Sequence, residues 1–108
     1  MQSLEQIQAE LERGDMTPSR AADLMVVVSA KYGRAADEYI EANAKYAEEF
    51  NRIRDDYKSV TATERSLDVT EVGLKKHLWK YQCKKAEHMM SALKTLAYVR
   101  TAEAKNVL

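Results

Sequence analysis

Apolar and aromatic residues recur every seven positions along the first half of the chain. One series runs through Met25, Tyr32, Tyr39, Tyr46, Ile53 and Val60, and a second runs through Ala22, Ser29, Ala36, Asn43, Phe50 and Tyr57. A seven-residue repeat of this kind keeps one seam of a long helix against a partner helix. The pattern therefore predicts a long helix over residues 17–58, with the two series as its d and a positions.

Local signals mark the ends of the predicted helices. Ser3 and Gln6 have the spacing of a capping box, and Gly14 is a typical helix stop, which predicts a short helix within 1–14. Thr17 and Pro18 suit the N-cap and first position of the long helix. Ser and β-branched residues between 59 and 70 predict a connection, with a short helical turn around 64–67.

A second long helix is expected over 71–105, capped by Thr70 or Asp68. Val72, Trp79, Ala86 and Leu93 share one heptad position, and Lys76, Cys83, Met90, Ala97 and Ala104 share its neighbour. With only 3 Gly and 1 Pro in 108 residues, loops must be few. We expect one all-α domain over 1–108, in which the long helices form an antiparallel hairpin that completes its thin core by oligomerising. The expected oligomer interface comprises Tyr32, Tyr39, Tyr46, Phe50, Ile53, Trp79, Met90 and Leu93.

Asn43 is a polar residue in the otherwise apolar a series. If it is buried there, it fixes the register and oligomeric state of the helices at a cost in stability. If it faces solvent beside the seam, it has no such role. The sequence leaves both interpretations open.

The net charge is zero but unevenly distributed. Residues 1–58 hold 12 acids and 8 Lys or Arg, whereas residues 59–108 hold 5 acids and 9 Lys or Arg. A neutral total argues against a strong general nucleic-acid binder and leaves room for a local basic surface. No apolar run has the length of a membrane span, and residues 1–14 lack a signal-peptide core, so a cytoplasmic protein is expected.

The titratable residues do not form a recognisable catalytic or metal-binding motif. His77 and His88 are eleven residues apart, and neither has the three- or four-residue spacing to Cys83 that ligands on one helix face need. The adjacent acids Glu48-Glu49 and Asp55-Asp56 diverge around a helix, because neighbouring residues point about 100° apart. We therefore expect a protein that is not an enzyme and that has neither a metal nor a cofactor.

Two basic clusters are the candidate nucleic-acid contacts. The first is Arg52, Arg54 and Lys58 beside Tyr57, and the second comprises Lys75, Lys76, Lys80, Lys84 and Lys85, interleaved with Trp79 and Tyr81. Cations can contact phosphates, and exposed aromatic rings can stack on unpaired bases. The alternative is that both clusters are solvated helix faces, with Tyr57 and Trp79 in the core.

Four segments carry a resemblance to a known family. They are the acidic segment 4–13, Ile40-Glu41-Ala42 with Lys45, Arg52-Ile53-Arg54-Asp55-Asp56-Tyr57, and residues 99–104. In these segments the chain resembles the UvsY-type recombination mediators of T-even-like phages. The spacing between Ile40 and Arg52 is longer than in that family, and the C-terminal segment is shorter.

The resemblance implies a homo-oligomer that binds single-stranded DNA and loads a RecA-like recombinase in place of single-strand-binding protein. In that family the basic-apolar-basic motif, here Arg52 to Arg54, is tied to single-stranded DNA binding. Apart from the resemblance, we expect Lys45 to support the phosphate contacts of Arg52, Arg54 and Lys58. The alternative is a coiled-coil interaction protein without a DNA role, such as a phage adaptor or an inhibitor of a host protein, which the neutral charge favours.

Overall fold

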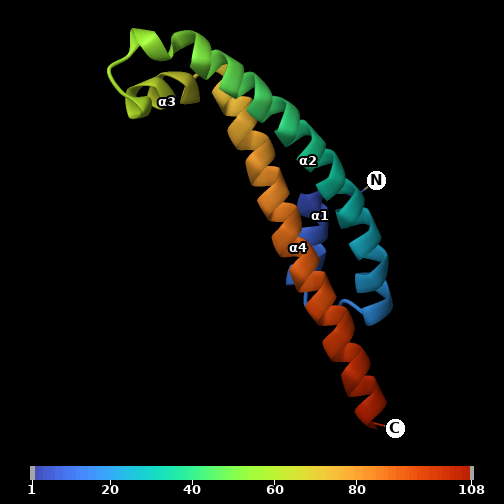
Figure 1. Cartoon of the computed structure of the whole chain (residues 1–108). Helices are drawn as coiled ribbons and strands as arrows, with labels where there is room; N and C mark the ends of the chain where they lie inside the picture. Colours follow the sequence, from blue (N-terminus) through green and yellow to red (C-terminus); the bar gives the residue numbers. More distant parts are fainter. Residues whose placement is uncertain (1, 108) are drawn as a thin grey trace. The chain divides into compact units, whose positions relative to one another are not determined.

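A computed structural model describes the backbone of residues 2–107 and the side chains of residues 2–98. Those residues form α1 (Leu4–Glu12), α2 (Pro18–Ile53), the 3₁₀ turn η1 (Arg54–Asp56), α3 (Val60–Asp68) and α4 (Glu71–Val107), without a β-strand among them. The long helices α2 and α4 run antiparallel (Figure 1). The predicted all-α hairpin is therefore confirmed.

The chain divides into two compact units, each containing a segment of both long helices. Unit 1 comprises residues 1–33 and 84–108, and unit 2 comprises residues 34–83. Unit 1 thus holds α1, the start of α2 and the later part of α4. Unit 2 holds the rest of α2, η1, α3 and the start of α4.

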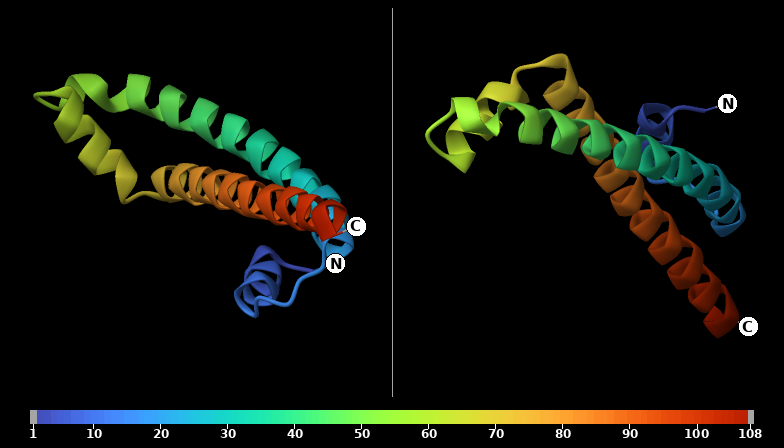
Figure 2. Two further views of the ribbon diagram at one scale, coloured as in Figure 1. Left: turned by 90° about the horizontal axis from the view of Figure 1, so that it is seen from below. Right: turned by 45° about the horizontal axis from the view of Figure 1, so that its top comes forward.

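The predicted helix ends in unit 1 are confirmed. The Ser3 hydroxyl accepts a hydrogen bond from the backbone N–H of Gln6 at 3.1 Å, and the Gln6 side chain accepts one from the Ser3 N–H at 2.8 Å, which completes the capping box. Gly14 has φ +76°, a left-handed conformation that favours glycine and ends α1. Thr17 Oγ1 then accepts from the N–H of Arg20 at 3.1 Å and caps α2. The left view of Figure 2 shows the short segment that joins α1 to α2.

The core of unit 1 is aliphatic and is shared by its three helical segments. Ile7, Leu24, Val28 and Leu93 have 1% or less of their surface exposed. Their neighbours in the same cluster are Leu4, Met16, Ala21, Ala86 and Met89. At nine residues α1 is too short to persist alone in water, so its burial against this core is what holds it.

Unit 2 differs from the expected helix-and-connection pattern. The first long helix ends at Ile53 rather than at Lys58, and residues 60–68 form the complete helix α3. Tyr57 has an extended backbone (φ −124°, ψ 153°), and the Ser59 hydroxyl accepts from the N–H of Ala62 at 3.1 Å. Ser59 is therefore an N-cap that starts a new helix where the heptad pattern alone would continue the old one.

A close approach between α3 and α4 closes unit 2. Thr70 Oγ1 accepts from the N–H of Gly73 at 3.3 Å, so Thr70, rather than Asp68, is the cap of α4. A side chain at the buried Gly73 would meet the backbone of α3, with the Asp68 Cα only 2.7 Å away and the Leu67 carbonyl oxygen closer still. Glycine is thus required at this contact.

The seam of α2 differs by one residue from the predicted register. The buried positions include Ala21, Val28, Ala35 and Ala42, again seven apart, whereas the predicted a residues Ala22, Ser29, Asn43 and Tyr57 are exposed. Small side chains at this spacing allow another helix to approach closely. Tyrosines occupy the neighbouring series, and the hydroxyls of Tyr32 and Tyr46 reach carboxylates at the edge of the packing. The exposed Asn43 matches the solvent-facing alternative.

Candidate nucleic-acid interface

The first basic cluster lies on irregular backbone at the end of α2 rather than on a continuous helix. Arg52 is in the last turn of α2, Arg54 opens η1, and Tyr57 and Lys58 occupy the extended link to α3. All four side chains are exposed, and Tyr57 is 41% exposed. The Tyr57 hydroxyl is 2.6 Å from the Ser66 hydroxyl of α3, a contact that restrains the ring. An exposed ring that is close in sequence to exposed cations has the residue types that unpaired bases and phosphates contact.

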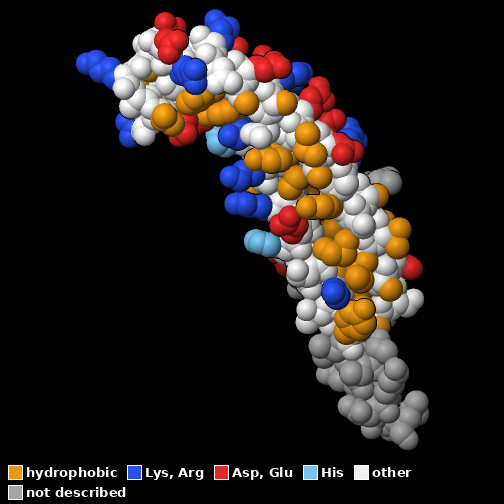
Figure 3. Space-filling view, viewed as in Figure 1, with side chains coloured by type: hydrophobic (Ala, Val, Ile, Leu, Met, Phe, Trp, Pro, Cys, Tyr) orange, Lys and Arg blue, Asp and Glu red, His pale blue; other side chains and the backbone are white. Residues whose placement is uncertain are grey.

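Acidic residues reduce the positive charge of this cluster. Arg52 donates to Glu49 from Nε at 3.0 Å and is ion-paired with it, which lowers the pKa of the Glu49 carboxyl. Asp55 and Asp56 lie between Arg54 and Tyr57 in the chain. Figure 3 accordingly shows acidic and basic side chains alternating over the end of unit 2 formed by η1 and α3. Arg54 and Lys58 are the cluster's strongest candidates for phosphate contact.

The second basic cluster is divided between the two units. Lys75, Lys76 and Lys80 belong to unit 2, and Lys84 and Lys85 belong to unit 1. The Lys76 ammonium lies 3.9 Å from the centre of the Tyr46 ring, a cation–π contact within the chain. Lys85 Nζ donates to Glu5 of α1 at 2.8 Å.

Lys75, Lys80 and Lys84 are exposed, and Trp79 is half-buried. These three lysines therefore remain candidates for phosphate contact, whereas the position of Trp79 favours a packing role. Lys45, the supporting residue on α2, is exposed and lies 3.4 Å from Glu41 one helical turn away. An exposed pair of this kind contributes little stability and can exchange for a phosphate.

A polar network joins the three helices of unit 2, and no pattern in the sequence predicts it. The Tyr46 hydroxyl of α2 donates to Asp68 Oδ1 of α3 at 3.0 Å, and His77 Nε2 of α4 lies 3.1 Å from the same oxygen. Burial, followed by the hydrogen bond to Asp68, raises the pKa of Tyr46 to about 12. The hydrogen bond with His77 is the main cause of the lowered pKa of Asp68. The network links α2, α3 and α4 within unit 2 through polar side chains.

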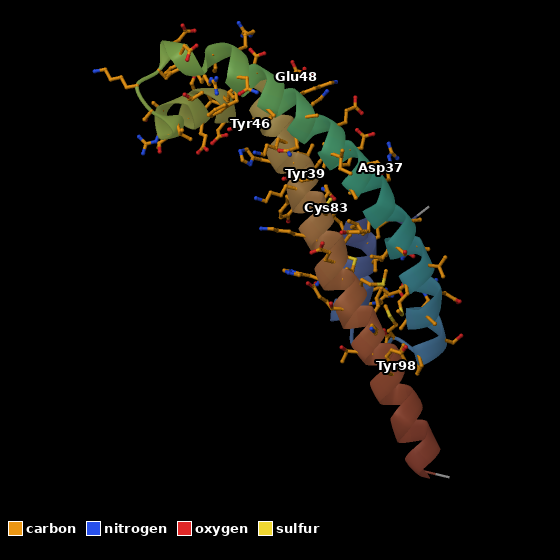
Figure 4. The ribbon with its side chains drawn as sticks, in the orientation of Figure 1. Asp37, Tyr39, Tyr46, Glu48, Cys83 and Tyr98 are labelled. Carbon is orange, nitrogen blue, oxygen red and sulfur yellow. The ribbon has the colours of Figure 1, made fainter. Side chains whose placement is uncertain are left out.

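The expected interface residues separate into covered and accessible sets. Leu93 is 0% exposed in unit 1, and Tyr46 is 8% exposed in unit 2, so both are covered by packing within the chain itself. Figure 4 shows Tyr39 and Tyr46 on the side of α2 that faces α4, and Asp37 and Glu48 on the opposite side. The residues that keep some accessible surface are Tyr32, Tyr39, Phe50, Ile53, Trp79 and Met90.

Tyr32 is 38% exposed, and its hydroxyl donates to Glu87 Oε1 of α4 at 3.1 Å within unit 1. The residues 99–104 that contribute to the family resemblance, with Ala104 among them, lie outside the described side chains.

Comparisons with known proteins identify no relative: no family model, curated protein or solved structure matches the chain. Among the described residues, no group of three His, Cys, Asp or Glu side chains is arranged to hold a metal ion. The described part of the chain also has no helix that is long and apolar enough to cross a membrane.

Proposed function

We propose that this protein binds single-stranded DNA as a homo-oligomer and helps to load a RecA-like recombinase in place of single-strand-binding protein. In this proposal it works in the cytoplasm, as an accessory protein of phage-type recombination. The observation that carries the DNA-binding step is the exposed segment 54–58, where Tyr57 lies between Arg54 and Lys58 in the chain. The recombinase and single-strand-binding protein enter through the family resemblance.

The geometry favours single strands over duplex DNA. An exposed ring held by Ser66 offers a stacking surface to a base, which only an unpaired strand can present. The local charge is small because Asp55 and Asp56 accompany the cations. An oligomer repeats the same weak site, so that several protomers binding one strand reach a useful affinity.

The test is fluorescence anisotropy of a labelled single-stranded oligonucleotide titrated with the protein, beside a duplex of the same sequence. Arg54→Ala is expected to weaken single-strand binding and to reduce the slope of log K against log salt by about 0.7 for each phosphate that the variant no longer binds. Arg34→Ala, which removes an exposed arginine of α2 outside the segment 54–58, is the control and is expected to bind like wild type.

Helicity and oligomeric mass are measured on the same samples, because Arg54 is exposed and its truncation should change neither. If Arg54→Ala binds like wild type, the segment 54–58 is not the site. If the wild-type protein binds neither DNA even at low salt, the proposed function fails.

A second function, a helical interaction protein without a DNA role, is favoured by the ion pairing of the basic residues. Arg52 is paired with Glu49, Lys45 with Glu41 and Lys85 with Glu5, so several of the candidate cations already have acidic neighbours. This candidate predicts no salt-dependent DNA binding by the wild-type protein. The same titration therefore separates the two functions.

A further inference from the structure

Unit 2 exposes an apolar face on α4. Leu74 is 60% exposed, Leu78 is 50% exposed and Tyr81 is 60% exposed. Their spacing of four and then three residues places them on one side of the helix. We refer to Leu74, Leu78 and Tyr81 as the α4 face. Large apolar side chains grouped in this way on a soluble protein are typical of an interaction surface.

Unit 2 also exposes a face with the same spacing on α2. Ile40, Ala44 and Ala47 are exposed, again four and then three residues apart, and Ile40 is 67% exposed. We refer to these three residues as the α2 face. Two alanines make it shallow, so it can receive large side chains from another helix. The α4 face supplies large side chains at the matching interval, as in knobs-into-holes packing.

The helices that carry the two faces also have opposite charges. Within unit 2, α2 carries five acids and three basic residues, and α4 carries three lysines and the single acid Glu71. Asp37, Glu41 and Glu48 are exposed next to the α2 face, whereas Lys75 and Lys80 are exposed on the helix of the α4 face. Charges of opposite sign around two apolar surfaces favour their association and set its orientation.

The two faces cannot meet within one chain. Ala35, Ala42 and Tyr46 are buried on the side of α2 that packs inside unit 2, and Figure 4 shows Asp37 and Glu48 on the side away from α4. The α2 face lies on that outer side. Its complement on α4 must therefore come from a second copy of the chain.

We infer that the α4 face of one protomer docks on the α2 face of the next. Such a contact joins two different surfaces, so each protomer keeps one unused surface until a ring closes or a filament grows. This inference rests on the homo-oligomer of the proposed function and names its interface. The lysines and acids beside the two faces lie at the edge of the contact, where they guide association.

Three variants that introduce the same residue test the interface. Ala44→Glu places a carboxylate on the α2 face, and Leu78→Glu places one on the α4 face. Val60→Glu is the control, because Val60 is 62% exposed at the start of α3, outside both faces. Native mass spectrometry and sedimentation are expected to show an oligomer for wild type and Val60→Glu. Each of the other two variants alone should be a monomer of 12.3 kDa.

The decisive sample is an equal mixture of Ala44→Glu and Leu78→Glu. The first variant keeps an intact α4 face and the second keeps an intact α2 face, so together they should form a one-to-one dimer that grows no further. An interface made of the same surface on both partners would give no such dimer. A mixture that stays monomeric, or a single variant that keeps the wild-type mass, overturns the inference.

Circular dichroism checks that both variants fold. Both should stay helical, because Glu is a good helix former and both sites are exposed. If either variant loses helicity, Ala44→Gln and Leu78→Ala replace the pair, and each should require a higher protein concentration to assemble. If both of these variants assemble at the same concentration as wild type, the inference is overturned.

Anisotropy with single-stranded DNA on the same samples separates this inference from the proposed function. One result is that the wild-type protein forms an oligomer that the substitutions abolish and yet binds no DNA. That result supports the interface between the α4 face and the α2 face and overturns the proposed DNA-binding function. A wild-type protein that is monomeric at every concentration overturns the interface together with the oligomer on which it rests.

Discussion

At the residue scale, Gly73 shows how tight packing can favour glycine over alanine inside a helix. Glycine inside a helix costs roughly 1 kcal/mol relative to alanine, so the sequence alone favours alanine at this position. The structure gives the opposite result, because a Cβ on Gly73 would overlap the backbone at Leu67 and Asp68. Backbone atoms at the end of α3 cannot rotate away as a flexible side chain can. The glycine therefore allows α3 and α4 to meet.

Gly73→Ala is expected to destabilise the protein by about 1–3 kcal/mol, the usual cost of overpacking a close contact. Gly33→Ala is the matched control, because nothing lies within 4 Å of the position that its Cβ would take in α2. That control should gain up to about 1 kcal/mol from helix propensity. Urea unfolding followed by circular dichroism measures both changes. A Gly73→Ala protein as stable as wild type would show that α3 and α4 do not make this contact.

The sequence predicts only part of the polar network in unit 2. Heptad spacing places Tyr46 in the seam, and it is indeed buried. Asp68 and His77 meet it only because α3 folds as a separate helix and places Asp68 between α2 and α4. Neither partner follows from a period along the chain. Spacing thus predicts where Tyr46 lies but not what its hydroxyl binds.

At the element scale, a short helix is held by a charged pair as well as by its apolar stripe. Glu10 of α1 accepts two hydrogen bonds from the Arg20 guanidinium of α2, at 2.9 and 3.0 Å, and a longer one from Gln2 at 3.3 Å. The hydrogen bonding with Arg20 lowers the pKa of Glu10 to about 2. The ionised form of Glu10 is therefore the one that adds to the apolar packing in holding α1 on α2.

Acid should remove this contribution in a defined range of pH. A carboxyl whose pKa is lowered by folding stabilises the folded state above its ordinary pKa of 4.5, and the contribution disappears as the pH falls towards 2. Glu10→Gln should therefore melt below wild type at pH 7, and the difference should vanish near pH 2.

Thermal melts followed by circular dichroism across this range measure the effect. Glu12→Gln serves as the control, since the Glu12 carboxylate accepts a hydrogen bond from Gln8 within α1 itself and so does not tie α1 to α2. A difference between wild type and Glu10→Gln that is the same at pH 7 and pH 2 would exclude the ion pair as its cause.

The sequence predicts helix ends that a single residue type decides, but it does not predict the register of the buried seam on α2. Ser3, Gly14, Thr17 and Thr70 act through their own side chain or backbone freedom, so local rules find them. The break at Ile53 and the one-residue shift of the seam depend on which side of α2 the rest of the chain covers. Heptad spacing fixes the period of a seam but not which of two adjacent series is central.

At the scale of the whole molecule, charge sets what kind of nucleic-acid binding is possible. The 17 basic residues are balanced by 17 acids, and the candidate contacts are a few exposed cations in each chain. Duplex DNA, which attracts proteins mainly through its phosphates, should therefore bind weakly. The location of these cations is predictable from the sequence, whereas their acidic neighbours in space, such as Glu5 beside Lys85, are not.

A salt titration tests how many phosphate contacts contribute to DNA binding. If the proposed function holds, roughly three phosphate contacts per chain predict a slope of log K against log salt of about −2 for single-stranded DNA. The duplex of the same sequence should bind more weakly at every salt concentration, because the stacking proposed for Tyr57 is open only to unpaired bases. Anisotropy titrations at several salt concentrations measure both. Equal affinity for the two DNAs would contradict the role of Tyr57 as a stacking residue.

The position of the single tryptophan gives the molecule a built-in reporter. Trp79 is half-buried in unit 2, and the sequence holds no other tryptophan. Its fluorescence emission therefore follows the environment of unit 2 alone, whereas circular dichroism in the far ultraviolet follows helices in both units. Two unfolding curves recorded on one unlabelled sample thus reveal whether the two halves of the chain melt together or in succession.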